Sequence, residues 1–214
     1  MLLSNVIPLS KELALPKTSK HKGWHISQFI ESKSLPWALM GLFIGFTYSG
    51  VLVFIPIELN SMCAGIWGNA FFAIFALMII ISRPLVGKVY ARYGSKFIIY
   101  PGLGLFILGL FGLGLATTPM AIIFTAPLLG LGYGAAQPAF QALAIQSAPI
   151  ERAGVSTATY FLALDISVGA GSIILALLAN ALGYQYLYII TALVMVIALS
   201  LYHVWIKKYT PLEI

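Results

Sequence analysis

Charged residues are scarce in this sequence: Asp, Glu, Lys and Arg make up 8% of its 214 residues, whereas hydrophobic residues make up 60%. A soluble domain holds about 25% charged residues, so this composition excludes an ordinary soluble protein. Cysteine is equally rare. Because Cys63 has no second cysteine to pair with, an internal disulfide is excluded, and we expect no metal site.

The motifs of common enzymes are also missing. The sequence holds no HExxH, GxSxG or Walker pattern, and its glycine-rich run at 130–134 lies inside an apolar stretch without a preceding strand. We therefore expect neither an enzyme nor a bound cofactor. The net charge of +6 requires no nucleic-acid partner, since basic loops at an anionic membrane surface account for it.

Long apolar stretches, in contrast, are abundant. A helix of about 20 apolar residues crosses the roughly 30 Å hydrocarbon core of a bilayer, and the sequence supplies six stretches of about that length. They do not alternate as the strands of a membrane barrel do. We predict an all-α membrane protein of six transmembrane helices, within the ranges 36–57, 64–81, 97–116, 120–145, 155–182 and 184–206.

The basic residues are distributed unevenly between the connections. Of the 12 Lys and Arg residues, five precede the first stretch, four lie between the second and third, one lies between the fourth and fifth, and two follow the sixth. The other three connections have none. Because Lys and Arg are retained on the cytoplasmic side during insertion, we expect a multi-pass protein of the cell membrane with both termini in the cytoplasm.

This pattern divides the chain into three parts. Residues 1–35 form a lysine-rich cytoplasmic tail or linker, residues 36–208 the six-helix domain, and residues 209–214 a short cytoplasmic tail. Small residues recur at four-residue spacing within two of the apolar stretches. Such spacing lets helix backbones approach closely, so we expect helix contacts along Gly41, Gly45 and Ser49, and along Gly130 and Gly134.

The most distinctive local pattern lies between the second and third stretches. Four cations and two glycines occur within residues 83–96. Glycine permits a tight turn between helices, and the cations can interact with helix carbonyl ends or lipid phosphates. We expect a cytoplasmic loop whose important residues are Arg83, Gly87, Arg92, Gly94 and Lys96.

This segment resembles the loop motif of the major facilitator superfamily, Gly-x-Leu-a-Asp-Arg-x-Gly-Arg-Lys. Gly87, Arg92, Gly94 and Lys96 match the motif position by position. In that superfamily the motif occurs once in each six-helix half, and the second copy is usually the more degenerate. The departures here are Val89 for Leu, Ala91 for Asp and Ser95 for the first basic residue.

A degenerate motif after a lysine-rich segment resembles the central linker followed by the C-terminal half. The stretch 130–172 also resembles that half in bacterial drug- and sugar-efflux members. The resemblance implies a bundle of 3+3 inverted repeats. It further implies alternating access, with proton-coupled efflux of a small organic molecule.

The length of the chain raises an alternative. Members of this superfamily have two six-helix halves, and 214 residues supply one. We therefore expect a truncated transporter, a half that pairs with a separate six-helix chain, or a homodimer. The alternative function is a non-transporting truncated membrane protein, or a partner or regulator of an intact transporter.

Polar residues inside the apolar stretches are the candidate site. Asp165 lies about ten residues inside the fifth stretch, where an unpaired acid is costly, so we expect it to be the one buried acid. It would couple protons or contact substrate, or else stabilise helix packing. Tyr133, Gln137 and Gln141 recur at four-residue spacing in the fourth stretch, and would line a cavity or form interhelical hydrogen bonds.

Overall fold

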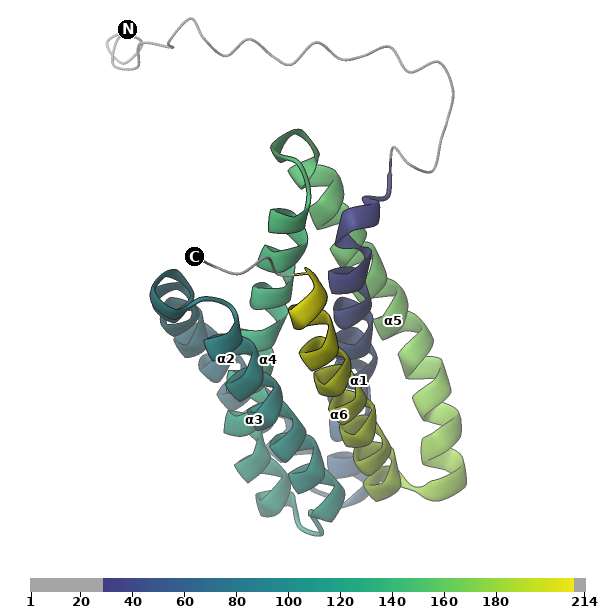
Figure 1. The fold of residues 1–214 in the computed structure, drawn as a ribbon. Helices are drawn as coiled ribbons and strands as arrows, with labels where there is room; N and C mark the ends of the chain where they lie inside the picture. Colours follow the sequence, from purple (N-terminus) through teal and green to yellow (C-terminus); the bar gives the residue numbers. More distant parts are fainter. Residues whose placement is uncertain (1–28, 210–214) are drawn as a thin grey trace, which may run out of the picture.

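The computed structural model describes residues 29–209, and their long α-helices are joined by short connections (Figure 1). Six of these helices are long and apolar enough to cross a membrane, which confirms the predicted all-α architecture. Most of the predicted tail and the residues after 209 lie outside the described range. The helices are α1 (Leu35–Ser61), α2 (Gly65–Tyr93), α3 (Lys96–Leu115), α4 (Pro119–Ser147), α5 (Ala153–Leu182) and α6 (Tyr184–Tyr209).

Local sequence signals account for several helix ends. At the start of α4, the hydroxyl of Thr118 accepts a hydrogen bond from the amide of Ala121 at 3.3 Å, and Pro119 occupies the first turn. Gly94 and Gly183 end α2 and α5 with φ angles of 79° and 89°. Glycine adopts this left-handed conformation without a Cβ penalty, so both helices end sharply and the chain reverses direction.

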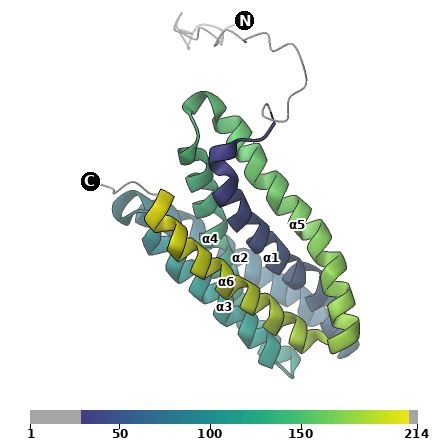
Figure 2. The same cartoon turned by 45° about the vertical axis from the view of Figure 1, so that its right-hand side comes forward.

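The helices form two related triplets, α1–α3 and α4–α6. Helices α1 and α4 lie at the centre; α5 packs against α1 as α2 packs against α4, and α6 packs against α1 as α3 packs against α4 (Figures 1 and 2). The two triplets run in opposite directions, since α1 starts at the end where α4 finishes. The contacts therefore follow the 3+3 inverted arrangement that the resemblance implied.

Small residues hold the central helices against their neighbours. A Cβ atom at Gly45 would lie 2.6 Å from the backbone oxygen of Leu164, so a larger residue there would displace α5 from α1. Gly41 and Ser49, one turn away on either side, are buried along the same helix. The other predicted pair packs α4 against α2 and consists of Gly130 and Gly134.

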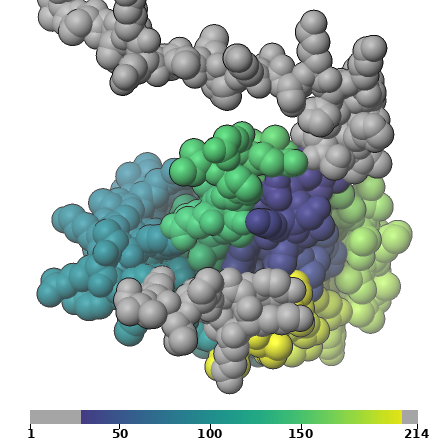
Figure 3. Space-filling view, turned by 45° about the horizontal axis from the view of Figure 1, so that its top comes forward, coloured from purple at the N-terminus to yellow at the C-terminus, as the bar shows by residue number. Residues whose placement is uncertain are grey.

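We call one end of the bundle the basic end. It holds the start of α1, the α2–α3 turn at 94–95, the α4–α5 connection at 148–152 and the end of α6. Figure 3 views this end and shows the start of α1 beside the α4–α5 connection, with the α2–α3 region projecting away from them. The remaining three connections lie at the opposite end.

Candidate functional site

Helices α2 and α5 have the most open surfaces of the six. Their apolar windows are the least buried within the bundle, 17% for α2 and 22% for α5, compared with 61% for the window of α1. Each packs against one central helix, α2 against α4 and α5 against α1. The bundle therefore leaves exposed surface on two helices that flank its centre.

Four polar or aromatic side chains lie at a similar depth on the helices of this region. Tyr48 of α1, Arg83 of α2, Tyr133 of α4 and Asp165 of α5 are each 10 to 14 residues from the basic end of their helices. At 1.5 Å per residue, this places all four about 15–21 Å from that end. We call these four residues the mid-depth layer.

The mid-depth layer is connected by aromatic stacking and by electrostatic interaction. The rings of Tyr48 and Tyr133 stack with centroids 4.4 Å apart and an interplanar angle of 19°, and Phe75 of α2 lies 6.1 Å from Tyr133. Tyr133 also interacts electrostatically with both Arg83 and Asp165. Rings from α1, α2 and α4 thus meet at Tyr133, and the charged side chains of Arg83 and Asp165 lie within electrostatic range of it.

Asp165 differs from its expected environment. Its side chain is exposed on α5, and the structure shows no hydrogen bond or ion pair for it within residues 29–209. The expectation that Asp165 is the one buried acid was wrong. The buried acid within the apolar helices is Glu58, near the end of α1, whose exposed fraction is 3%. The hydropathy pattern did not predict that Glu58 is buried, because Glu58 lies beyond the predicted end of the first apolar stretch.

The two predicted glutamines lie on α4 below Tyr133. Gln137 and Gln141 are half-buried, and their side-chain amides make no hydrogen bond within the described part of the chain. The backbone oxygen of Gln137 accepts a hydrogen bond from the hydroxyl of Tyr160 at 3.0 Å, which ties α4 to α5. The free amides are available to a ligand, whereas the contact between helices is made by the backbone.

The predicted loop is mostly helical. Helix α2 continues to Tyr93, so Arg83 and Gly87 lie within it rather than in a connection. The expectation of a loop over residues 83–96 was wrong for residues 83–93, and the turn consists of Gly94, with its positive φ, and Ser95. Of the two remaining motif residues, Lys96 starts α3, while the guanidinium of Arg92 lies over the ring of Tyr93 at 5.2 Å.

A network at the basic end was not predicted from the sequence. Glu31, just before α1, forms an ion pair with Arg152 of the α4–α5 connection, and its amide donates to the hydroxyl of Thr159 at 3.0 Å. The hydroxyls of Ser34 and Ser156 lie 2.7 Å apart. These contacts fasten the start of α1 to the facing ends of α4 and α5, across more than 100 residues of sequence.

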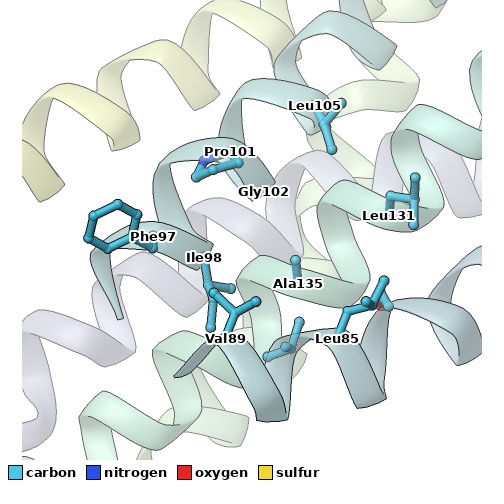
Figure 4. Close-up of a pocket in the computed structure, with 11 residues that line it drawn as sticks. Leu85, Val89, Phe97, Ile98, Pro101, Gly102, Leu105, Leu131 and Ala135 are labelled. Atoms are coloured by element: carbon cyan, nitrogen blue, oxygen red, sulfur yellow. The ribbon is translucent and has the colours of Figure 1, made fainter. Parts of the chain in front are cut away.

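An apolar pocket lies elsewhere in the bundle. A space of about 290 Å³ opens between α2, α3 and α4 toward the basic end, and Figure 4 shows Phe97, Pro101 and Leu105 on one side of it and Leu85 and Val89 on another. Its lining is apolar except for one serine hydroxyl. One hydroxyl gives this pocket few groups to orient a polar ligand, so the mid-depth layer, which has two charged side chains, is the better candidate site.

Comparison with known proteins places this arrangement in a family. A sequence profile described as the Major Facilitator Superfamily matches residues 4–172. The chain belongs to the Major Facilitator Superfamily. Its membership confirms the resemblance drawn from residues 87–96 and identifies the chain as part of a family of membrane transporters.

Individual members of the superfamily show how much of a transporter the chain represents. It is 29% identical over 151 residues to an uncharacterized MFS-type transporter, YhhS, of Escherichia coli O6:H1, covering 69% of this chain and 37% of the relative. YhhS of Salmonella typhi is 27% identical over 147 residues. The chain therefore spans little more than a third of the length of these relatives.

The fold is also shared with a solved structure. A crystal structure of the peptide transporter POT in complex with alafosfalin matches with a TM-score of 0.73 at 14% identity. The match covers 82% of this chain and 38% of that chain. The six-helix bundle thus corresponds to about one half of a superfamily transporter.

Proposed function

We propose that the chain forms one half of a secondary transporter that moves a small organic molecule by alternating access, as efflux in exchange for protons. The mid-depth layer carries the proposal. Arg83 and Asp165 supply opposite charges at one depth, from the two helices with the most open surfaces. Ionisable residues at membrane depth are costly and mark substrate or proton pathways.

A substrate pathway between two halves also requires a second six-helix unit. In superfamily transporters the substrate site lies at the interface of two repeats, and the open surfaces of α2 and α5 supply one side of such an interface. A separate six-helix unit or a second copy of this chain would supply the other. We place the basic end in the cytoplasm of the cell membrane, in accordance with the distribution of Lys and Arg.

The side chains of the layer favour an aromatic cation as the transported molecule. The stacked rings of Tyr48 and Tyr133 offer π faces, and the carboxylate of Asp165 offers a counter-charge. A cation bound there would compete with a proton for Asp165. Such competition couples the outward movement of the substrate to the inward movement of a proton.

Ethidium accumulation in inside-out membrane vesicles tests this proposal. Vesicles are prepared from cells that produce the chain, so that any second six-helix unit of those cells is present in the membrane. Under an imposed proton gradient these vesicles should accumulate ethidium. In Asp165→Asn vesicles, gradient-driven accumulation should fall to the level of vesicles that lack the chain, since an amide cannot carry a proton. Insertion should be retained because the Asp165 side chain is exposed and makes no hydrogen bond or ion pair within residues 29–209. Equal accumulation by both forms would assign the coupling to another residue.

A further inference from the structure

A second polar site lies at the opposite end of the bundle, far from the mid-depth layer. A cavity of about 270 Å³ opens where the end of α1 meets the α5–α6 turn. Glu58 and Ser61 of α1 and Tyr184 and Gln185 of α6 contribute to its lining. A carboxylate, a hydroxyl and an amide therefore converge on one space.

The carboxylate at this cavity is buried and incompletely satisfied. Glu58 is 3% exposed, and it interacts with the hydroxyl of Tyr188, which is fully buried on α6. Neither the Oε2 atom of Glu58 nor the Tyr188 hydroxyl has a hydrogen bond of good geometry to any residue that the structure describes. A buried polar group without a partner costs about 1–3 kcal/mol, and more when it is charged.

No basic side chain near Glu58 compensates its charge. The titratable groups around it are Tyr184, Tyr186 and Tyr188 of α6 and Cys63 of the α1–α2 turn, and the end of α5 contributes none. The Lys and Arg residues between positions 29 and 209 lie toward the basic end. Because a buried, uncompensated carboxylate is unfavourable, neutralisation of Glu58 by a proton or a metal cation is favoured.

The number of ligands identifies the cation. A metal such as Ca²⁺ takes about 6–8 oxygen ligands, often from several carboxylates. The described residues contain no cluster of three or more His, Cys, Asp or Glu that could hold one. A proton needs a single carboxylate oxygen. We propose that Glu58 is a proton-binding site that exchanges with water through the cavity at the opposite end, with Tyr188 as its hydrogen-bonding partner.

This site would give the proposed transporter an entry point for protons on the face opposite the basic end. Proton binding by Glu58 does not require transport, however, and is measured without any substrate. If Glu58 binds no proton, this site is ruled out and the transport proposal is unaffected. If ethidium is not transported, the proposal of proton binding by Glu58 is unaffected.

Labelling with dicyclohexylcarbodiimide tests the site, because this reagent modifies protonated carboxyl groups in apolar surroundings. The full-length chain in detergent should be labelled at Glu58 at acidic pH, as located by peptide mass spectrometry, and the labelling should disappear as the pH rises. Glu58→Gln should abolish this adduct. Glu151→Gln removes an exposed carboxyl group at the basic end; it is the control variant and should leave labelling at Glu58 unchanged.

A second variant tests the partner without removing the carboxyl group. Tyr188→Phe deletes one hydroxyl and keeps the ring that packs in the core. If the hydroxyl donates to the ionised carboxylate, labelling of Glu58 at fixed neutral pH should increase about threefold. Labelling that is independent of pH would overturn the proposal. Protection of Glu58 by Na⁺ at constant pH would also overturn it, in favour of a sodium site.

Discussion

At the scale of single residues, Asp165 and Glu58 show how position in the bundle determines what an acid can do. Both lie in helices long enough to cross a membrane, yet Asp165 is exposed within the mid-depth layer and Glu58 is 3% exposed near the end of α1. The sequence located Asp165 because it interrupts a long apolar stretch. It could not locate Glu58, because burial at a helix end depends on which helix packs against it.

Glycines allow a direct test of packing at this scale. Gly45→Ala should lower the stability of the bundle by about 1–3 kcal/mol, because its Cβ would lie 2.6 Å from the backbone oxygen of Leu164. Gly87→Ala is the control, since it also lies within a helix but has no atom within 4 Å of an added Cβ. It should be neutral, or stabilising by up to about 1 kcal/mol.

Thermal unfolding of the two variants in the same detergent measures this difference. The predicted order of melting temperatures is Gly87→Ala at or above the unaltered chain, with Gly45→Ala clearly below it. A Gly45→Ala protein that melts with the unaltered chain would show that α1 and α5 are not closely packed at this position.

At the scale of elements, hydropathy predicted the existence of all six helices but not their ends. The second stretch was expected to end at residue 81, where charged residues begin, whereas α2 continues to Tyr93. A helix need not stop where its apolar surface stops, since charged side chains on its later turns reach the water and lipid phosphates at the membrane surface. This continuation places Arg83 within α2, and hence in the mid-depth layer.

The contacts before α1 also depend on elements distant in sequence. Arg152→Ala should release the segment before α1, because the ion pair with Glu31 and the hydrogen bond from Arg152 to the backbone oxygen of Ile30 are lost together. The Arg152 side chain is 39% exposed, so solvent screening limits the expected loss to about 1 kcal/mol.

Hydrogen exchange measures the effect where it should occur. Amide exchange in residues 29–34 should accelerate in Arg152→Ala, while exchange at the opposite end stays unchanged. Exchanging the charges in Glu31→Arg/Arg152→Glu should restore part of the protection. If the segment exchanges equally fast in the unaltered chain and in Arg152→Ala, the ion pair does not fasten it.

At the scale of the whole molecule, the distribution of basic residues predicts the orientation in the membrane. Cys63 is exposed in the α1–α2 turn at the opposite end, which we place outside the cell. A membrane-impermeant maleimide should therefore label it in intact cells. In a Cys63→Ser background, Lys88→Cys at the basic end should be labelled after the membrane is permeabilised and not before. The reverse pattern would invert the orientation.

The family resemblance, and with it the 3+3 bundle, could be inferred from the motif between Gly87 and Lys96 because its spacing survives three substitutions. The candidate site could be inferred in part. Sequence spacing placed Tyr133, Gln137 and Gln141 on one helix. Their relation to Tyr48 and Arg83 arises from packing between helices, which no local pattern records.

In the proposed transporter, the mid-depth layer faces a water-filled pathway rather than lipid. It is tested by the reaction of Asp165→Cys with a small water-soluble thiol reagent, in native membranes and a Cys63→Ser background. The control is Leu108→Cys on α3, since Leu108 lies 12 residues from the basic end of its helix, as Asp165 does, and is 61% exposed. We expect fast reaction at position 165 and little at position 108; equally slow reaction at both positions would show that Asp165 faces lipid.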